Sequence, residues 1–262
     1  MTNLIYKPAG RAAEYAEWAC NLFRGCSHGC TYCYAPAVLR MSREAFGTPC
    51  PRKDVLRLLE KEARARQAGR ALLASPSPKG RDGQGVADQV LLCFTTDPYQ
   101  PEDAEAGITR RAIEILHDTG HSVRVLTKGG TRALRDLDLF TPADAFGVTL
   151  TCLSNRFSLE WEPGAALPDS RIAALRAFHE AGIPTWVSLE PVLSPLSAVT
   201  IIRRTHGIVD HWKIGAMNYH PHAQGIDWPK FAREVVATLE GVGAQYLLKD
   251  DLAKHLPGVS EP

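Results

Sequence analysis

Three cysteines crowd into eight residues of this chain and carry its clearest chemical signal. Cys26, Cys30 and Cys33 follow the spacing C-x3-C-x2-C within the segment NLFRGCSHGCTYCYA. Three thiolates on one tight loop can each bind one iron of a four-iron four-sulfur cubane, whereas a purely structural cluster generally takes four cysteines. Gly25 and Gly29 lack side chains that would keep such a loop from folding closely around an inorganic core. The spacing therefore predicts a cluster with one iron open to a chelating amino acid.

Two other interpretations of the loop stay open at this point. The first is a zinc site in which His28, Cys20 or Cys50 joins the three cysteines, because structural zinc takes four ligands. The second treats the cysteines as small buried hydrophobes, which is common for single cysteines but not for three at this spacing. Core packing or an idle surface thiol best explains Cys20, Cys50 and Cys152, so we assign these three no role.

The cysteine loop resembles the signature of the radical S-adenosylmethionine superfamily, down to the aromatic Tyr32 directly before the last cysteine. The segment TTDPYQPE, which begins at Thr95, and the segment LTKG, which contains Lys128, narrow the resemblance to the spore photoproduct lyase-like enzymes. The likeness covers about residues 21–249. It implies that a four-iron four-sulfur cluster reductively cleaves S-adenosylmethionine (SAM) to a 5′-deoxyadenosyl radical, which abstracts a hydrogen atom from a substrate.

Polar residues at the ends of apolar runs are candidates for binding SAM. Thr95, Thr96 and Asp97 end one such run and offer acceptors for the ammonium group of the methionine moiety. Glu190 follows another run, so we expect it to face the site with Ser188 and to contact cofactor or substrate, with helix capping as the alternative. These residues are expected to place the cofactor at one end of the strands.

The family resemblance implies further roles. Lys128 would pair with the methionine carboxylate, although a solvated lysine at the start of a helix fits the sequence equally well. Thr149 or Thr151 would bind the ribose, and Tyr32 would contact the adenine by stacking or through its backbone. Tyr34, directly after the last cysteine, would relay a radical. An electron donor such as flavodoxin or ferredoxin is the partner that this chemistry requires.

One position departs from the spore photoproduct lyase pattern. Phe94 stands where that enzyme has a cysteine that returns a hydrogen atom to the product radical, and Cys93 lies one position earlier. Adjacent strand residues point to opposite faces, so Cys93 should face away from the barrel axis if Phe94 faces inward. Photoproduct repair is therefore not assigned, and a nucleic acid, a peptide and a small metabolite all stay candidate substrates.

The family motifs and several basic clusters favour nucleic acid among these substrates. Arg40 and Arg43 follow the cysteine loop by a few residues and are placed to meet a phosphate. Arg64, Arg66 and Arg70 lie in a segment rich in Glu and Lys, and they most simply form the solvated face of a helix.

Alternating apolar runs and amphipathic segments predict the elements that must position these residues. Strands are expected at 89–96, 122–127, 145–152, 185–189 and 211–217, helices at 51–69, 101–119, 131–140, 169–181, 195–205 and 228–240, and a last apolar run at 245–248. Strands separated by crossover helices form a parallel sheet, and about six such units give an open or partial (β/α)6 barrel of parallel strands with outer helices in a single domain. Chemistry in such folds lies at the C-terminal ends of the strands.

The expected domain organisation is one barrel with short additions at both ends. Residues 1–20 are expected to form an N-terminal extension, 21–249 the barrel, and 250–262 a C-terminal tail. The segment at about 75–88 is rich in Ser, Pro and Gly, which predicts a flexible insertion.

Composition excludes several classes of protein. The chain has 262 residues, 45% hydrophobic and 23% charged, and no apolar run approaches the length that spans a bilayer. The N-terminus lacks the pattern of a signal peptide, and seven cysteines suit reduced metal ligands better than a secreted disulfide framework. We therefore expect a cytoplasmic protein, a monomer, with no membrane partner. With a net charge of +1, the molecule as a whole should not bind polyanions strongly. The sequence contains neither a hydrolytic triad nor a phosphate-binding glycine loop.

Overall fold

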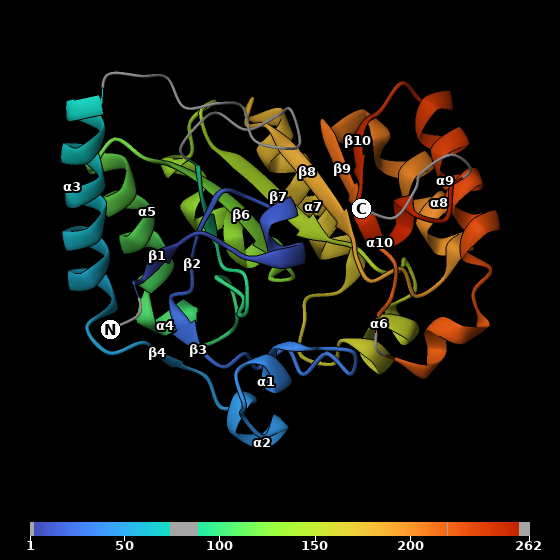
Figure 1. The fold of residues 1–262 in the computed structure, drawn as a ribbon, viewed down its shortest axis with the longest axis horizontal. Helices are drawn as coiled ribbons and strands as arrows, with labels where there is room; N and C mark the ends of the chain where they lie inside the picture. The colour runs from blue at the N-terminus through green and yellow to red at the C-terminus, as the bar shows by residue number, and fades with distance from the viewer. Residues whose placement is uncertain (1–2, 74–88, 219, 257–262) are drawn as a thin grey trace.

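One eight-stranded sheet organises the computed structural model, which describes residues 3–73, 89–218 and 220–256 (Figure 1). In spatial order the strands are β1 (Ile5–Tyr6), β2 (Trp18–Cys20), β5 (Gln89–Leu92), β6 (Ser122–Thr127), β7 (Ala145–Thr149), β8 (Thr185–Leu189), β9 (His211–Ile214) and β10 (Gln245–Leu248). β1 runs antiparallel to β2, and every other neighbouring pair is parallel. Within the described ranges no ladder joins β1 to β10, so the sheet forms an open barrel, as the sequence predicts.

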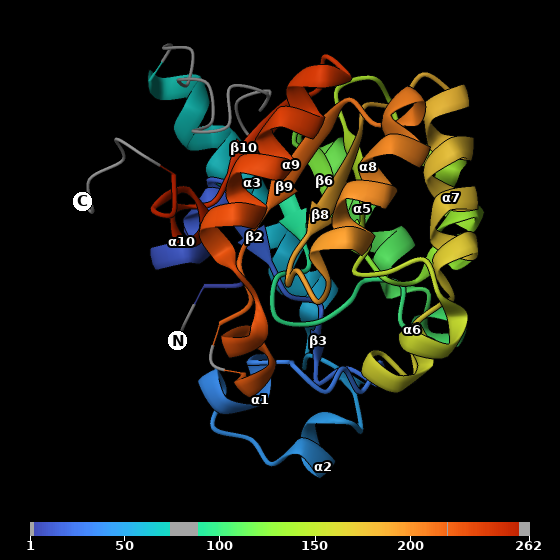
Figure 2. The same ribbon diagram turned by 90° about the vertical axis from the view of Figure 1, so that its right-hand side faces the viewer.

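Apolar residues on both faces of the sheet explain its parallel strands and outer helices. Every residue of β5, β7, β8 and β9 is buried, which is typical of parallel strands covered on both sides. The outer helices are α3 (Val55–Leu73), α5 (Ile108–Asp118), α7 (Pro168–Glu180), α8 (Pro195–Thr205) and α9 (Trp228–Gly241) (Figure 2). In α5, for example, Ala112, Ile113 and Leu116 are buried.

Two predicted helices differ from those observed. The single helix expected over 101–119 is divided into α4 (Asp103–Ala106) and α5, because Gly107 between them has a left-handed φ of +59°. Asp103 then stabilises the start of α5, since its Oδ1 accepts a hydrogen bond of 3.0 Å from the backbone N–H of Thr109. The segment 131–140 forms the 3₁₀ helix η2 (Gly130–Leu139) instead of an α-helix.

Residues 3–20 take part in the sheet, whereas the sequence predicts an extension over residues 1–20. They contribute β1, β2 and the 3₁₀ helix η1 (Gly10–Glu14). Lys213 of β9 donates hydrogen bonds of 2.8 and 3.0 Å to the backbone carbonyls of Glu14 and Tyr15, so this segment reaches across the barrel. At the other end, α10 (Asp250–Ala253) buries Leu252 against the core. The insertion expected at 75–88 lies outside the described residues.

Short elements surround the end of the sheet where the parallel strands finish. They are β3 (Phe23–Arg24) paired with β4 (Cys50–Pro51), α1 (Ala35–Val38), α2 (Arg43–Phe46), α6 (Asn155–Trp161) and η4 (Pro221–Gly225), while η3 (His206–Ile208) leads into β9. Figure 1 shows α1, α2 and α6 along this end. None of the helices in the described ranges is long and apolar enough to span a membrane.

Candidate active site at the C-terminal end of the sheet

The cysteine loop connects β3 to α1, and its path depends on glycine. Gly25 has a φ of +89°, and a Cβ atom there would lie 2.5 Å from the carbonyl oxygen of Phe46. The neighbouring backbone N–H of Cys26 donates a hydrogen bond of 2.8 Å to that same carbonyl. Gly29, with a φ of +64°, makes the second sharp turn. The two glycines therefore determine the path of the cysteine loop.

Arg43 of α2 stabilises the cysteine loop through hydrogen bonds to its backbone. Its guanidinium donates hydrogen bonds to the carbonyl oxygens of Cys30 at 3.2 Å, Thr31 at 2.8 Å and Cys33 at 3.4 Å. The sequence pairs Arg43 with Arg40 as a phosphate contact, but these donors are engaged with the loop. Arg40 itself is exposed.

The three thiols lie in partly buried surroundings. Cys30 is buried, while Cys26 and Cys33 are half-buried. Burial raises the pKa of Cys30 to about 11, with nearby Lys128 opposing the rise. Burial and the carboxylate of Asp97 raise the pKa of Cys26 above its usual range. Metal binding would therefore displace thiol protons, and three thiolate donors beside a lysine cation suit an iron–sulfur cluster.

The side chains that could complete a zinc site are turned elsewhere. His28 is buried with Nδ1 3.5 Å from the Asp97 carboxylate and Nε2 3.3 Å from the Arg132 guanidinium, and burial lowers its pKa to about 4. Cys20 lies in the core, and Cys50 is exposed on β4. The described residues contain no set of three His, Cys, Asp or Glu arranged for a single ion. A four-iron four-sulfur cluster does not require the three cysteines to converge on one ion, because each thiolate binds its own iron.

Asp97 acts as an acceptor for the protein's own donors. Its Oδ1 accepts hydrogen bonds from the backbone N–H of Tyr99 at 2.8 Å and from Thr127 Oγ1 at 2.6 Å. Its Oδ2 accepts a hydrogen bond of 2.7 Å from the backbone N–H of Lys128. The carboxylate that the sequence offers to the methionine ammonium is thus already occupied in joining the ends of β5 and β6.

Of the two threonines before Asp97, Thr95 is linked to the segment that leads into β3 and the cysteine loop. Thr95 is half-buried, and its backbone N–H donates a hydrogen bond of 2.8 Å to Asn21 Oδ1, as does that of Phe94. Thr96 is buried. Asn21 therefore joins the strand end to the start of the cysteine loop, a contact that the sequence did not reveal.

Lys128 projects toward Tyr32 beside the cysteines. Its Nζ lies 5.7 Å from the centre of the Tyr32 ring, within cation–π range. Burial would lower the pKa of Lys128, but the nearby acidic groups of Cys30 and Glu162 outweigh it and raise the pKa. The hydroxyl of Tyr32 donates a hydrogen bond to Glu162 Oε1. The lysine side chain therefore lies beside Tyr32 and Cys30 and is not a solvated helix-start residue.

Glu162 and Arg171 form a buried ion pair that the sequence analysis missed. Arg171 Nη2 lies 2.5 Å from Glu162 Oε2, and both side chains are almost fully buried. Thr151 Oγ1 donates a hydrogen bond of 3.1 Å to Glu162, and Arg171 Nη1 donates one of 3.0 Å to the Thr149 carbonyl. Although burial acts to raise the pKa of Glu162, Arg171 and Lys128 lower it on balance. Thr149 and Thr151, which the family resemblance places at the ribose, therefore contact the buried Glu162–Arg171 pair.

Glu190 lies on the opposite side of the site, in a second polar cluster. Lys249 Nζ lies 2.8 Å from each Glu190 oxygen, and Tyr15 donates a hydrogen bond to the same carboxylate. Ser188 Oγ is 3.0 Å from the Tyr15 hydroxyl. Burial and the charge of Glu190 raise the pKa of Tyr15 well above its usual range. Helix capping, the alternative considered for Glu190, does not occur, because Ser194 caps α8.

Phe94 and Cys93 follow the end of β5 and pack in different clusters, although strand alternation does not extend to them, because Leu92 and Cys93 both lie in the main core. Phe94 packs with Tyr15, at 5.7 Å between ring centres, and with Tyr34, at 6.5 Å. Cys93 belongs to the main core with Cys20, and its sulfur accepts a hydrogen bond from Leu22 N–H. Tyr34, directly after the last cysteine of the loop, is half-exposed.

Four aromatic side chains gather close to Tyr32 of the cysteine loop. The Trp161 ring lies 6.4 Å from Tyr32, 5.3 Å from His220, 5.1 Å from His222 and 5.8 Å from Phe157, measured between centres. These rings come from the cysteine loop, α6 and η4. We call Phe157, Trp161, His220 and His222 the aromatic rim.

Comparison with known proteins agrees with this architecture. Residues 20–196 match the family model described as the Radical SAM superfamily. An uncharacterized protein of Mycobacterium tuberculosis is 28% identical over 198 residues, covering 74% of this chain and 54% of the relative. One from Methanocaldococcus jannaschii is 25% identical over 190 residues, covering 71% and 64%. The chain therefore spans about half the length of the first of these relatives and under two thirds of the second.

Two solved structures share the fold. Spore photoproduct lyase complexed with dinucleoside spore photoproduct superposes with a TM-score of 0.67 at 15% identity, covering 95% of this chain and 79% of that one. Streptococcus suis SuiB bound to S-adenosylmethionine gives a TM-score of 0.58 at 10% identity, covering 88% and 45%. At these identities the likeness extends to the fold alone.

Proposed function

The chain belongs to the radical SAM superfamily, and from this premise we propose that it binds a four-iron four-sulfur cluster through Cys26, Cys30 and Cys33 and acts on a nucleic acid or nucleotide-containing substrate. When bound, the cluster and SAM supply reductive cleavage to a 5′-deoxyadenosyl radical, which removes a hydrogen atom from the substrate. The observation that carries the proposal is the three-cysteine loop at the C-terminal end of an open parallel barrel. The protein's own contribution is to bind, orient and exclude water.

Residues around the cysteine loop would hold SAM. Lys128 would bind the methionine carboxylate through a charge-assisted hydrogen bond. Thr95 and Thr96 would lie near the ammonium group, whereas Asp97, which already accepts from Tyr99, Thr127 and Lys128, would not accept from it directly. Tyr32 would present its ring to the adenosine, because its hydroxyl is fixed by Glu162.

Removing the charge of Lys128 should weaken SAM binding. We expect Lys128→Ala to raise the dissociation constant of the anaerobically reconstituted protein by about 10- to 100-fold, since a hydrogen bond to a charged group contributes roughly 1.5–3 kcal/mol. Isothermal titration calorimetry measures the change, and Lys230→Ala, at an exposed position of α9, is the matched control. Unchanged affinity in Lys128→Ala would remove Lys128 from the cofactor site.

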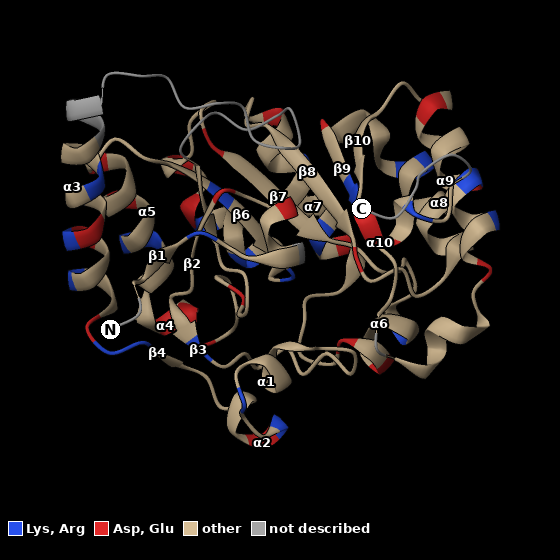
Figure 3. Ribbon diagram, viewed as in Figure 1, with Lys and Arg blue, Asp and Glu red and all other residues tan. Residues whose placement is uncertain are grey.

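The aromatic rim supports a substrate that contains nucleobases. Aromatic side chains bind single-stranded bases by stacking, and Trp161 of the aromatic rim lies beside Tyr32. Four exposed basic residues lie in this part of the chain: Arg24 on β3, Arg40 between α1 and α2, and Arg52 and Lys53 directly after β4. Figure 3 shows basic residues near α2 and β3. These residues would contact phosphates without reading sequence. Spore photoproduct lyase, a structural neighbour, holds a dinucleoside in its complex.

Binding of single-stranded oligonucleotides should depend on both features. We expect Trp161→Ala to weaken binding by about 1–3 kcal/mol, the usual contribution of one base–aromatic stack. Arg40→Ala should lower the slope of log K against log salt by about one, as expected for one lost phosphate contact. Leu159→Ala, an exposed residue of the same helix as Trp161, is the control for fluorescence anisotropy measurements. No binding at about 50 mM salt, where phosphate contacts are strong, would instead point to a peptide or a small metabolite.

A further inference from the structure

His28 lies between two of the expected cluster ligands but does not belong to the ligand set. Its side chain is only 2% exposed, and it contacts elements that are distant in the sequence. Its backbone carbonyl accepts a hydrogen bond of 2.9 Å from the N–H of Gly164, in the segment between α6 and α7. Its ring lies between Asp97, after β5, and Arg132, on η2. His28 thus joins the cysteine loop to three other segments through Gly164, Asp97 and Arg132.

The partners of His28 define which ring nitrogen carries the proton. Arg132 Nη2 lies 3.3 Å from Nε2, and a guanidinium has only donors, so Nε2 must accept. The proton of the neutral ring then lies on Nδ1, which faces the Asp97 carboxylate at 3.5 Å. Donor and acceptor are therefore matched on both sides of the ring.

Each partner is itself held rigidly. Arg132 Nε donates a hydrogen bond of 2.8 Å to the Tyr99 carbonyl, which directs the rest of the guanidinium toward His28. Asp97 Oδ2 accepts a hydrogen bond from the Lys128 N–H, so the contact continues to the residue expected to bind SAM.

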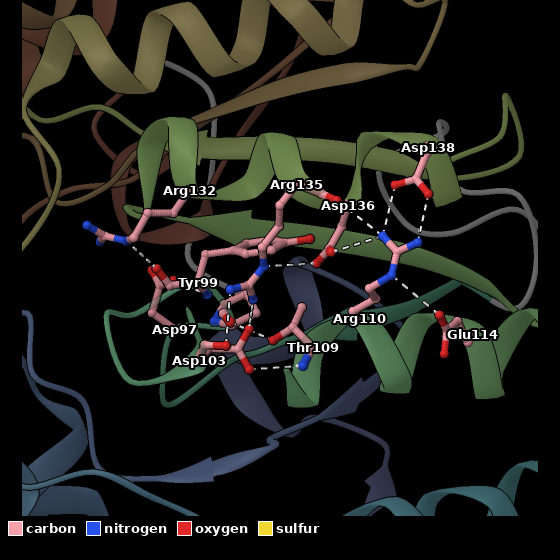
Figure 4. A network of polar contacts seen from close by, with 11 residues as sticks. Asp97, Tyr99, Asp103, Thr109, Arg110, Glu114, Arg132, Arg135, Asp136 and Asp138 are labelled. Atoms are coloured by element: carbon pink, nitrogen blue, oxygen red, sulfur yellow. Dashed lines mark hydrogen bonds and ion pairs between the residues drawn. The ribbon is translucent and has the colours of Figure 1, made fainter. Parts of the chain in front are cut away.

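A network of ion pairs holds η2 in turn (Figure 4). Arg135 pairs with the fully buried Asp103, and Arg110 of α5 contacts Asp136 at 3.4 Å and Asp138 at 2.7 Å. Arg132 therefore projects from a helix that is fixed to α4 and α5.

We propose that His28 is a positioning residue that fixes the cysteine loop to the strand ends and holds the Arg132 cation near the cluster. This inference rests on the proposed function, because it assumes a cluster at the cysteines. Partners outside the ligand set orient metal ligands and tune metal affinity and redox potential. His28 has the geometry for both effects, since one ring joins the ligand loop, a carboxylate and a cation.

The test compares cluster retention and potential in matched variants of the reconstituted protein. Loss of iron to a chelator should be about 10-fold faster or more in His28→Phe, which keeps the ring volume but removes both polar contacts. His28→Gln can still accept from Arg132 and donate to Asp97, so it should restore retention to within about 3-fold. His179→Phe, on α7, is the control.

Redox titration followed by electron paramagnetic resonance supplies a second measurement. Arg132→Gln should lower the midpoint potential of the cluster, because a nearby cation stabilises the more negative reduced form. It also keeps the proposal testable if His28→Phe does not fold.

The outcomes separate this inference from the proposed function. Wild-type protein that takes up no iron would contradict both. Wild-type protein with a full cluster, together with unchanged iron retention in His28→Phe or unchanged potential in Arg132→Gln, would overturn the role of His28 alone.

Discussion

Replacing any one of Cys26, Cys30 or Cys33 by Ala should abolish the brown colour of the reconstituted protein and most of its iron. Wild type should hold about four irons and four sulfides per chain, and a cubane with two protein ligands is poorly retained. The same variants should release no 5′-deoxyadenosine from SAM under reducing conditions. Iron and acid-labile sulfide assays after anaerobic reconstitution measure the first effect, and chromatography of the reaction mixture measures the second.

Two other cysteines provide controls for this experiment. Cys50→Ala removes an exposed thiol on β4, and Cys152→Ala removes a buried thiol three residues after β7. Both variants should retain iron and sulfide at the wild-type level. If Cys50→Ala lost as much iron as Cys30→Ala, the assignment of three ligands would fail and the zinc-type interpretation with a fourth cysteine would return.

Breaking the buried Glu162–Arg171 pair should cause a large loss of stability. Glu162→Gln keeps the size of the side chain but leaves the Arg171 cation unpaired, and that guanidinium is only 1% exposed. Removal of one partner from a buried pair typically costs about 3–5 kcal/mol. Denaturant unfolding of variant and wild type, prepared in the same cofactor state, measures the difference.

An exposed ion pair gives the matched control. Glu60 and Arg64 lie 2.8 Å apart on α3 with solvent-exposed side chains, so Glu60→Gln should change the unfolding free energy by no more than about 0.5 kcal/mol. Similar losses for Glu162→Gln and Glu60→Gln would contradict the buried pair.

The cost of Glu162→Gln should also depend on pH. Arg171 and Lys128 hold the folded-state pKa of Glu162 below its usual value. The unfolded chain therefore binds this proton more readily than the folded chain, so the carboxylate contributes stability above the unfolded pKa of about 4.3. That contribution is lost as pH falls through the folded pKa. The difference between wild type and Glu162→Gln should be full at neutral pH and shrink below about pH 4.

Local chemistry made some features of the site predictable from sequence. The three cysteines and two glycines act within one loop, so their spacing alone indicates the loop and its ligands. Lys128 and Glu190 follow apolar runs, and the ends of parallel strands meet at one edge of a sheet. Recognising the strands in the sequence is therefore enough to predict that Lys128 and Glu190 lie at this edge of the sheet.

Other features depend on partners that only the tertiary structure brings together. Arg171 lies in an amphipathic helix segment where a charged residue ordinarily faces solvent, and nothing near it in the sequence indicates Glu162 as a buried partner. An aspartate can bind a ligand or accept hydrogen bonds from the protein. The sequence does not show that Asp97 accepts from three protein donors. β1 has two residues and β2 has three, too few to show an alternating pattern, so the sequence predicts only an extension over residues 1–20.

The formation of 5′-deoxyadenosine tests the central claim most directly. Wild-type protein, reconstituted anaerobically with iron and sulfide and reduced with dithionite, should convert SAM to 5′-deoxyadenosine and methionine slowly even without substrate, and the Cys30→Ala variant should not. A wild-type protein that carries one tightly bound zinc, shows no visible absorption and yields no 5′-deoxyadenosine would contradict the account.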